Sequence, residues 1–420
     1  MNKLTVTLKQ HTPLIHFQHD QDRATLRASE VKPKLDRFIL TKLGNGNYDE
    51  GKREAIRNSW LLGSGKHPAL NYKIKIWVNS QNPSKEYMIV SYIKEESKIL
   101  LNNNNINVIS NSPYFAQEEK TKSILKNPKE WNSIDKKGIF HENVYLEINC
   151  SNNELSNCIT KYIQEFFLVY NFGTRQSKGF GCFEMIKGKI NNVNIPLNDN
   201  VDLLKENFCF VYKKKVSSSD VIKIFEQINN DYKLLKSGRT RPYAKSKMML
   251  YALQKQSRWD KKFLKSNINQ RYETEEEEVY YRLEGSNRKN ENENDLSFHY
   301  WRALLGLAEQ YEFLLENPPL GNKRNKIIVK VKNNSNIQRI SSPILFKIIN
   351  DVIFIVGKEV PPEVLNKEFS FIVSIDKDDY WQDKELEETL TTPPSFSLSQ
   401  FMKFSMNNKM GMSLDYETIK

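Results

Sequence analysis

The sequence predicts an α+β protein made of two ferredoxin-like units, each with a β-α-β-β-α-β order of elements and each carrying insertions. Two observations favour this class: strand patterns alternate with amphipathic helices, and the series recurs once along the chain. The 420 residues favour two or three domains, because a domain usually spans about 100–200 residues. A hydrophobic content of 39% and an aromatic content of 11% are enough for packed cores.

The strands of the first unit are expected within residues 1–200. Residues 4–8 alternate apolar and polar side chains, as a half-buried strand does. Further strand patterns follow at residues 72–79, 88–93 and 144–149. Residues 102–142, rich in Asn, Lys and Ser, interrupt the series and are interpreted as an irregular insertion.

Two helices complete the first unit. Residues 25–43 carry apolar side chains at near-helical spacing, with Pro33 indicating a first turn or a kink. The clearest helix covers residues 154–170, where apolar and aromatic side chains recur every three or four positions. Gly173 stands where a left-handed C-cap is expected, and residues 180–186 return as a strand.

A second, interrupted copy of the unit is expected within residues 201–385. A strand at residues 207–212 leads to the N-cap cluster at 217–220, which opens a helix that runs to about residue 235. A helical insertion is expected at about residues 243–315. Strand patterns resume at residues 326–331, 344–349, 352–356 and 369–375. Residues 386–420, rich in Ser, Met and Asn, are interpreted as a C-terminal tail.

The overall charge and the cysteines narrow the class of partner. A formal net charge of +12 suits an anionic partner, either nucleic acid or a phospholipid surface. Nucleic acid is favoured because no apolar stretch approaches the roughly 20 residues of a spanning helix, and the first residues lack the apolar core of a signal peptide. The four cysteines have no paired spacing, which indicates reduced residues in a cytoplasmic protein without a disulfide framework or a zinc site.

Most of the excess positive charge lies in residues 232–271, the basic segment. It holds twelve Lys or Arg residues and one acid, Asp260. Five aromatic residues are interleaved with these charges: Tyr232, Tyr243, Tyr251, Trp259 and Phe263. Aromatic rings stack on unpaired bases while Lys and Arg bind phosphates, a combination typical of single-stranded RNA binding. The alternative is an ordinary solvated helix face. The candidate RNA-binding residues here are Arg239, Arg241, Lys245 and Arg258.

A glycine-rich loop, residues 171–181, lies between the clearest helix and the strand that follows it. Its glycines, Gly173, Gly179 and Gly181, permit positive φ, so successive amides can form an anion-binding nest. Four further side chains add charge or hydrogen-bond donors: Arg175, Gln176, Ser177 and Lys178. Phe180 either enters the core or stacks on a base. The alternative interpretation is a flexible helix-to-strand turn.

The position of this glycine loop excludes two nucleotide-binding motifs. Rossmann and P-loop glycines follow a strand and open a helix, whereas this loop follows a helix and precedes a strand. No cofactor and no small-molecule substrate are therefore expected.

Three segments of the sequence resemble the RAMP superfamily of CRISPR-associated RNA-binding proteins. The first is Thr12-Pro13-Leu14-Ile15-His16, followed by residues 26–32 and Arg37. The second is the glycine loop, and the third is Arg339-Ile340-Ser341-Ser342-Pro343-Ile344. The pattern is most similar to the large two-domain RAMP subunit of the Cmr, or type III-B, effector complex.

The resemblance implies a function and further site residues. It implies a non-catalytic, cytoplasmic subunit of an antiviral ribonucleoprotein that contacts the 3′ region of the crRNA and helps to capture target RNA beside other protein subunits. It also implies that RNA is bound by Arg27, Lys32 and Arg37 at the first helix and by Arg339, Ser341 and Ser342 in the second unit.

Two rival functions remain open from the sequence. Some RAMP proteins are metal-independent endoribonucleases that process precursor crRNA, and such chemistry commonly uses His as general acid or base. His11, His16 and His19 cluster near the start of the chain, without the acidic or Cys partners of a zinc site. A structural role is the favoured interpretation of these histidines. The other rival is a structural subunit that makes no direct contact with RNA.

Overall fold

The computed structural model describes residues 1–16, 25–63, 68–80, 82–90, 95–110, 137–240, 242–272, 297–308, 310–314, 326–333, 340–374, 386–408 and 412–420. It is a mixed α+β structure that divides into two compact units. The first unit comprises residues 1–229, 345–356 and 416–420, and the second comprises residues 230–344 and 357–415.

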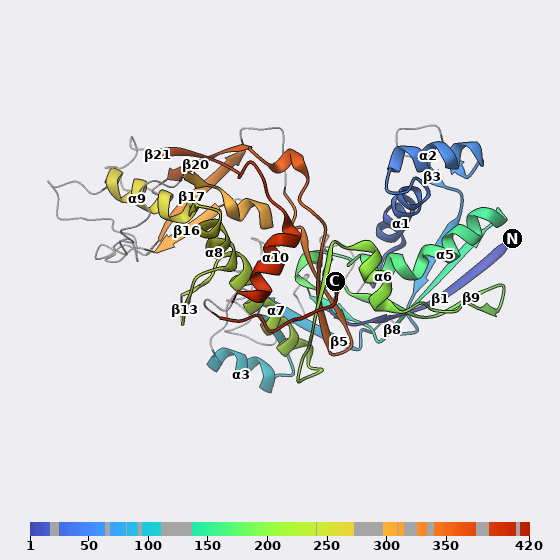
Figure 1. The fold of residues 1–420 in the computed structure, drawn as a ribbon. Coiled ribbons are helices and arrows are strands. Elements are labelled where there is room, and N and C mark those ends of the chain that lie inside the picture. The colour runs from blue at the N-terminus through green and yellow to red at the C-terminus, as the bar shows by residue number, and fades with distance from the viewer. Residues whose placement is uncertain are drawn as a thin grey trace. The chain divides into compact units, whose positions relative to one another are not determined.

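The first sheet of the first unit is antiparallel throughout. Its strands are β1 (Asn2–Gln10), β4 (Lys73–Trp77), β8 (Asn143–Cys150), β9 (Phe183–Ile190) and β10 (Val193–Asn194). Their order is β10-β9-β1-β8-β4, so β1 lies between β9 and β8 (Figure 1). The strands predicted at residues 4–8, 72–79 and 144–149 are thereby confirmed, and the strand predicted at 180–186 begins three residues later, at Phe183.

Helices α1 (Ala28–Leu43) and α5 (Asn153–Val169) contact each other and pack on one face of this sheet (Figure 1). Alternate residues of β1, namely Leu4, Val6 and Leu8, are buried on that face. The side chain of Asn152 caps α5 by accepting a hydrogen bond from the Leu155 amide at 2.9 Å. Because β1 alternates buried with half-exposed residues, its opposite face is solvated.

Helix α5 does not end at Gly173, contrary to the prediction. Its C-cap is Tyr170, which is extended with φ −106° and ψ 144°. The buried ammonium of Lys347 donates to the carbonyls of Phe167 and Tyr170, at 2.7 and 3.0 Å. The ammonium of Lys347 therefore hydrogen-bonds the free carbonyls at the C-terminal end of this helix, where the sequence predicted a glycine C-cap. Pro33 lies in the second turn of α1.

Smaller elements complete the part of the first unit that precedes β11. They are α2 (Tyr48–Arg57), β2 (Leu61–Leu62), β3 (Ala69–Leu70), β5 (Lys85–Val90), α3 (Glu95–Asn103), β6 (Asn107–Ser110), β7 (Gly138–Phe140) and α6 (Asn200–Asn207). Strands β6, β5 and β7 form a three-stranded sheet. The insertion at residues 102–142 is therefore not wholly irregular, since β6 and β7 fall within it; its residues 111–136 lie outside the described residues.

A second sheet of the first unit has the order β18-β19-β11-β22. Its strands are β11 (Phe210–Lys215), β18 (Ile344–Ile349), β19 (Val352–Gly357) and β22 (Glu417–Thr418). Five consecutive residues of β19, from Ile353 onward, are buried, so this strand is covered on both faces. The strands predicted at 344–349 and 352–356 are confirmed, and the strand predicted at 207–212 is present as β11 but begins at Phe210, after α6 ends at Asn207; all three share this sheet.

The second unit contains a four-stranded antiparallel sheet with the order β16-β17-β20-β21. Its strands are β16 (Gln310–Leu314), β17 (Lys326–Asn333), β20 (Glu368–Ser374) and β21 (Leu386–Thr391). The strands predicted at 326–331 and 369–375 are thus present as β17 and β20. They belong to a different sheet from β18 and β19.

The other elements of this part of the chain are helices α7 (Val221–Lys236), α8 (Lys247–Gln254), α9 (Asp260–Tyr272) and α10 (Leu398–Asn407), with strands β12 (Arg239–Thr240), β13 (Tyr243–Ala244), β14 (Ser257–Trp259) and β15 (Ser297–His299). The expected helical insertion at about 243–315 is therefore mixed, because strands β13 to β16 lie within it. None of the helices in the described part of the chain is long and apolar enough to cross a membrane.

Candidate nucleic-acid interface

The shape of the glycine loop is set by two close backbone approaches. Gly173 has φ +75°, and a Cβ placed there would lie 2.5 Å from the Ile15 carbonyl oxygen. Gly181 has φ +65°, and its Cβ would lie 2.0 Å from the carbonyl oxygen of Phe172. A side chain at either position would clash with backbone, so these glycines are required by packing of the loop.

The amides of the loop are largely engaged within the protein. Gly173 donates to Glu30 Oε1 at 2.7 Å, Thr174 donates to the Ile15 carbonyl at 2.8 Å, and Gly181 donates to the Pro13 carbonyl at 2.9 Å. The amides of Lys178 and Gly179 close the short 3₁₀ turn at residues 176–178. The predicted anion-binding nest is therefore wrong for these five amides, and any phosphate contact would come from side chains.

Two side chains of the loop support its conformation. Gln176 donates from Nε2 to the carbonyl of Gly173 at 2.7 Å. Phe180 is fully buried and stacks on Phe225, with ring centroids 4.1 Å apart. Of the two alternatives for Phe180, insertion into the core is confirmed.

Arg175 and Lys178 are the cations of the loop, and both are half-buried, as is Ser177. Arg175 has a left-handed backbone with φ 57°. Burial lowers the pKa of its guanidinium to about 10, which still leaves it protonated at neutral pH. A desolvated cation gains more from an anionic ligand than a fully hydrated one does.

The first turns of α1 are joined to the loop through Glu30. This carboxylate accepts the Gly173 amide and also the ammonium of Lys34, at 3.1 Å. Lys34 in turn lies 5.1 Å from the ring centroid of Phe172. The loop and the start of α1 are thus one structural feature, the α1–loop junction, defined here as residues 27–34 and 171–181.

The three predicted residues of α1 differ in their surroundings. Arg27 is the half-buried N-cap residue, and Arg37 is exposed, with its guanidinium 5.8 Å from the Tyr48 ring. Lys32 donates to Asp36 Oδ2 and to the Leu70 carbonyl, each at 2.9 Å. Lys32 therefore ties α1 to β3, and a contact of this residue with RNA stays a prediction.

The basic segment is not a single solvated face. Lys236 and Lys247 donate to backbone carbonyls of Gly306 and Asn408, and burial lowers the pKa of Lys236 to about 8. Asp260 is buried in an ion pair with Arg302, with Arg302 Nε 2.6 Å from Asp260 Oδ1. Lys236 and Lys247, two of the twelve cations, are therefore bound within the fold.

The aromatic residues of the basic segment are mostly in the core as well. Tyr251 and Trp259 are buried, and the Tyr232 hydroxyl donates to the Leu305 carbonyl at 2.9 Å. Tyr243 is 56% exposed and is the ring that fits the expected stacking role. The prediction that these rings interleave with the charges on one accessible surface is wrong for Tyr251 and Trp259.

The four predicted cations of this segment are placed as follows. Arg239 is half-buried, with Nη1 3.6 Å from the sulfur of Met412. Lys245 is half-buried, and the guanidinium of Arg258 lies 5.2 Å from the Phe298 ring. Arg241 lies outside the described residues. None of these positions tests the prediction that they bind RNA.

The predicted counterpart in the second unit is described only in part. Arg339 lies outside the described residues, and Ser341 is exposed. The hydroxyl of Ser342 donates to the Ile344 carbonyl at 3.1 Å and so supports the turn before β18.

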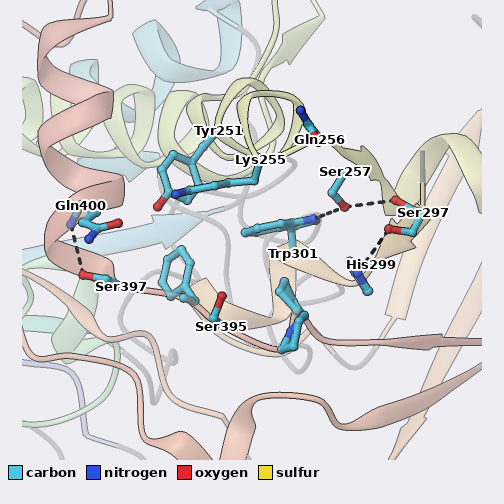
Figure 2. Close-up of a pocket in the computed structure, with 13 residues that line it drawn as sticks. Tyr251, Lys255, Gln256, Ser257, Ser297, His299, Trp301, Ser395, Ser397 and Gln400 are labelled. Atoms are coloured by element: carbon cyan, nitrogen blue, oxygen red, sulfur yellow. Dashed lines mark hydrogen bonds between the residues drawn. The ribbon is translucent and has the colours of Figure 1, made fainter. Parts of the chain in front are cut away.

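A cavity of about 470 Å³ opens in the second unit (Figure 2). Its described lining has an apolar part and a polar rim; the residues are Tyr251, Lys255, Gln256, Ser257, Ser297, His299, Trp301, Pro393, Pro394, Ser395, Phe396, Ser397 and Gln400. The indole N–H of Trp301 donates to Ser257 Oγ at 2.9 Å, and that hydroxyl donates to the Ser297 carbonyl at 3.1 Å. Because Ser257 is engaged in this way, the arrangement favours binding over nucleophilic chemistry.

The histidines of the first unit have structural partners. His11 is buried, with Nε2 2.8 Å from Glu184 Oε2, and its Nδ1 accepts the Asn350 amide at 3.1 Å. Burial lowers the pKa of His11, against the opposing effect of Glu184. His16 Nε2 lies 3.0 Å from the Thr25 carbonyl, and His19 lies outside the described residues. Among the residues that are described, no group of His, Cys, Asp and Glu is arranged to hold a metal.

Sequence reasoning missed the face of the first sheet that lies opposite α1 and α5, here called the open face. Its outward residues include lysines from strands β1, β4 and β9 together with Trp77 of β4 and Tyr145 of β8. The available signal was the alternation Lys73-Ile74-Lys75-Ile76-Trp77, in which the apolar partners pack on the core. These outward residues can be grouped on one face only when the register of β1, β4, β8 and β9 is known.

The fold and this interface define a two-unit α+β protein with separate clusters of cations. The Cmr1 N-terminal domain family matches residues 1–239, and the Cmr1 C-terminal domain family matches residues 243–417. The chain therefore belongs to the Cmr1 family, the RAMP-type subunits of the CRISPR-associated Cmr complex. The predicted resemblance is confirmed.

Solved structures with a similar chain include three from this group. The crystal structure of Cmr1 from Pyrococcus furiosus (apo form) is 12% identical with a TM-score of 0.33, over 56% of this chain and 72% of that chain. Type III-B Cmr-beta bound to cognate target RNA has a chain that is 12% identical with a TM-score of 0.39, over 85% of this chain and 94% of that chain. A chain of type III-B Cmr-beta bound to cognate target RNA and AMPPnP, in state 2 and in the presence of ssDNA, is also 12% identical, with a TM-score of 0.39. The similarity covers 96% of this chain and 97% of that chain. No curated protein matches the sequence.

Proposed function

We propose that this Cmr1-family chain is a non-catalytic RNA-binding subunit of the type III-B effector ribonucleoprotein. It contacts the 3′ region of the crRNA, helps to hold target RNA, and works beside the other protein subunits of the complex in the cytoplasm. Family matches to both halves of the chain support membership of the complex. Structural partners for His11 and His16 support a role without catalysis.

The α1–loop junction is the observation that carries the RNA-binding role. Glu30 accepts hydrogen bonds from the Gly173 amide and from Lys34, which joins the first turns of α1 to the loop that carries Arg175 and Lys178. Arg27, Lys34, Arg175 and Lys178 then belong to one feature built from segments about 140 residues apart. Clustered Lys and Arg side chains on a rigid support are what phosphate binding requires.

The strand order supports the finer proposal that the chain contains two ferredoxin-like RAMP units. Strands β1, β4, β8 and β9 with helices α1 and α5 follow the order β-α-β-β-α-β, and their sheet order is β9-β1-β8-β4. Strands β11, β18, β19 and β22 with helices α7 and α10 follow the same chain order, and their sheet order is β22-β11-β19-β18. In both, the fourth strand lies beside the first, as in a split β-α-β unit.

Replacement of Arg175 and Lys178 together by Ala tests the proposed function. About five phosphate contacts give a slope near −3.5 when the logarithm of the affinity for single-stranded RNA is plotted against the logarithm of salt concentration. The double variant is expected to make this slope about 1.4 shallower, because two contacts are lost. Fluorescence anisotropy with labelled single-stranded RNA between 50 and 300 mM salt measures both values.

The matched control replaces Lys161 and Lys205 by Ala, which removes the same charge from α5 and α6. This control is expected to bind RNA with the wild-type slope. A salt-independent affinity of the wild type would contradict the proposal. Loss of the folded state in the Arg175 and Lys178 variant, seen as a lower melting temperature, would instead favour a structural role for the loop.

A further inference from the structure

The open face of the first sheet is built from three rows of residues that lie side by side across the strands. The strand registers align Trp77, Tyr145, Thr7 and Lys187 in one row; Lys75, Glu147, Thr5 and Lys189 in the next; and Lys73, Asn149 and Lys3 in the third. Neighbouring strands are about 4.8 Å apart, so each row is a continuous strip of side chains.

This face is accessible. Lys73, Lys75 and Lys187 are exposed, and the side chain of Lys3 is 55% exposed. The intervening residues of β1 and β8 point the other way and are buried against α1 and α5. The two faces of the sheet are therefore chemically distinct, with an apolar face toward the helices and a polar face toward solvent.

Two aromatic rings lie within the polar face. Trp77 and Tyr145 stack with their centroids 5.8 Å apart and their planes 24° apart, and both residues are half-exposed. The side-chain amide of Asn79 donates from Nδ2 to the Tyr145 hydroxyl at 3.1 Å, and the Lys75 ammonium lies 5.5 Å from the centroid of the Trp77 ring. The rings are thus held in a fixed orientation on a surface where core packing does not require them.

The charge of the face is strongly positive. In these three rows five lysines, namely Lys3, Lys73, Lys75, Lys187 and Lys189, lie with one carboxylate, Glu147, and the neighbouring pair of residues on the same face adds Lys9 and the carboxylate of Glu184. The carboxylate of Glu147 is paired with Lys3 at 2.7 Å. Lysines gathered on one face of a sheet create a positive potential there, which attracts an anionic ligand.

We propose that the open face binds single-stranded RNA, with the Trp77–Tyr145 pair stacking an unpaired base and the lysines of β4, β1 and β9 contacting the backbone. This inference rests on the proposed function and adds a second surface, distinct in its residues from the α1–loop junction. Stacked aromatic rings beside Lys on a solvated sheet are the chemistry that recognises unpaired bases, since every base offers a π-face. A double helix would offer phosphates but no exposed base faces.

The test compares the full-length protein with its Trp77→Leu and Tyr145→Leu variants. The probe is a fluorescein-labelled 12-nucleotide oligouridylate, and the readout is fluorescence anisotropy. Each variant is expected to bind about tenfold more weakly, because one stacking surface is lost. Trp77→Phe and Tyr145→Phe, which keep a ring, are expected to stay within about threefold of the wild type.

A second probe separates base stacking from a general structural effect. On a 12-unit abasic oligonucleotide, which keeps the phosphates but has no bases, wild type and Trp77→Leu are expected to bind equally. The proposal is overturned if Trp77→Leu weakens both probes equally or neither. It is also overturned if Trp77→Leu binds RNA normally but no longer associates with the other Cmr subunits, because the face would then be a protein interface.

The outcomes also distinguish this inference from the proposed function. If Arg175→Ala with Lys178→Ala weakens binding while both leucine variants bind normally, the open-face proposal fails and the RNA-binding role stands. If the wild-type protein does not bind the oligouridylate at all, both fail.

Discussion

The two sheets of the first unit share the strand order fourth-first-third-second, but their third strands, β8 and β19, differ in exposure. In the first sheet, β8 alternates buried and half-exposed residues along its whole length. In the second sheet, β19 is buried from Ile353 to its end. A strand that is buried on both faces has no surface for a ligand, whereas one with alternating exposure keeps a face free. The comparison teaches that strand order alone does not predict which of the two sheets offers a binding face.

Lysine shows the same contrast. Lys75 of the first sheet is exposed beside Trp77, whereas Lys347 of the second sheet is fully buried and donates to two carbonyls of α5. Burial lowers the pKa of Lys347 to about 8. Lys75 is therefore available to an external anion, whereas Lys347 is engaged by backbone carbonyls inside the protein.

A lysine introduced into each sheet is expected to produce the largest difference between them. Ile355→Lys puts a charge at a fully buried position of β19, and Thr7→Lys puts one at a half-exposed position of β1. The first is expected to lower the free energy of unfolding by about 4 kcal/mol or more, because the charge has no partner there. The second is expected to cost less than about 1 kcal/mol, mainly through repulsion with Lys187 opposite. Urea unfolding monitored by circular dichroism measures both.

Equal effects of these two substitutions would show that the open face is covered in the folded protein. The open-face proposal would then lose its basis. Ile355→Val serves as a control for simple loss of volume, with an expected cost of about 1 kcal/mol.

Replacement of Lys347 by Met is expected to change how the free energy of unfolding depends on pH. The pKa of Lys347 is about 8 in the folded protein and near its ordinary value of 10.5 in the unfolded chain. The unfolded state therefore binds more protons between pH 8 and 10.5, so this lysine adds to the free energy of unfolding as pH rises through that window. The difference between wild type and Lys347→Met is expected to grow by up to about 3 kcal/mol from pH 8 to 10.5.

Urea unfolding of both proteins at intervals of pH checks this expectation. Groups that titrate in both proteins cancel in the difference. A difference that stays constant with pH would show that folding leaves the pKa of Lys347 unchanged, and one that falls would show that folding raises this pKa; either result contradicts the expectation. Lys187→Met on the open face is the matched control, and its expected cost at neutral pH is within about 0.5 kcal/mol.

Much of the first unit could be predicted from the sequence because its elements are amphipathic. The strand at residues 4–8 and the helix at 154–170 each carry the periodicity of their own buried face. The strands of the second sheet were also predicted, but continuous apolar runs such as 353–356 contain no information about partners or register. For that reason the sequence pattern does not show that β17 and β20 belong to a different sheet from β18 and β19.

The candidate site was less predictable because its contacts join distant segments. The sequence indicated a loop that needs glycine, yet the acceptors of its amides come from Glu30, Ile15 and Pro13, far away along the chain. Lys236 and Lys247 belong to a basic run, but only the fold reveals that carbonyls bind them. The open face needs the register of four strands, which no local pattern supplies.

Glu147→Gln gives the smallest effect and the finest test of the open face. Hydrogen bonds from Lys3 and from Asn149 hold the pKa of Glu147 below its ordinary value, so this side chain is ionised at neutral pH. Gln keeps an oxygen to accept the Asn149 hydrogen bond at 2.8 Å while removing the carboxylate from among the five lysines. RNA is expected to bind about two- to threefold more tightly at 50 mM salt, with the gain shrinking at 300 mM as screening increases.

Glu206→Gln on α6 makes the same change of formal charge at an exposed position of a helix. Because charges farther apart than about 10 Å are largely screened near 0.1 M salt, this control is expected to leave the affinity unchanged. Anisotropy titrations with the oligouridylate compare the two variants. Equal gains would mean that only the net charge of the protein attracts RNA, whereas a gain confined to Glu147→Gln would place the RNA backbone close to β8.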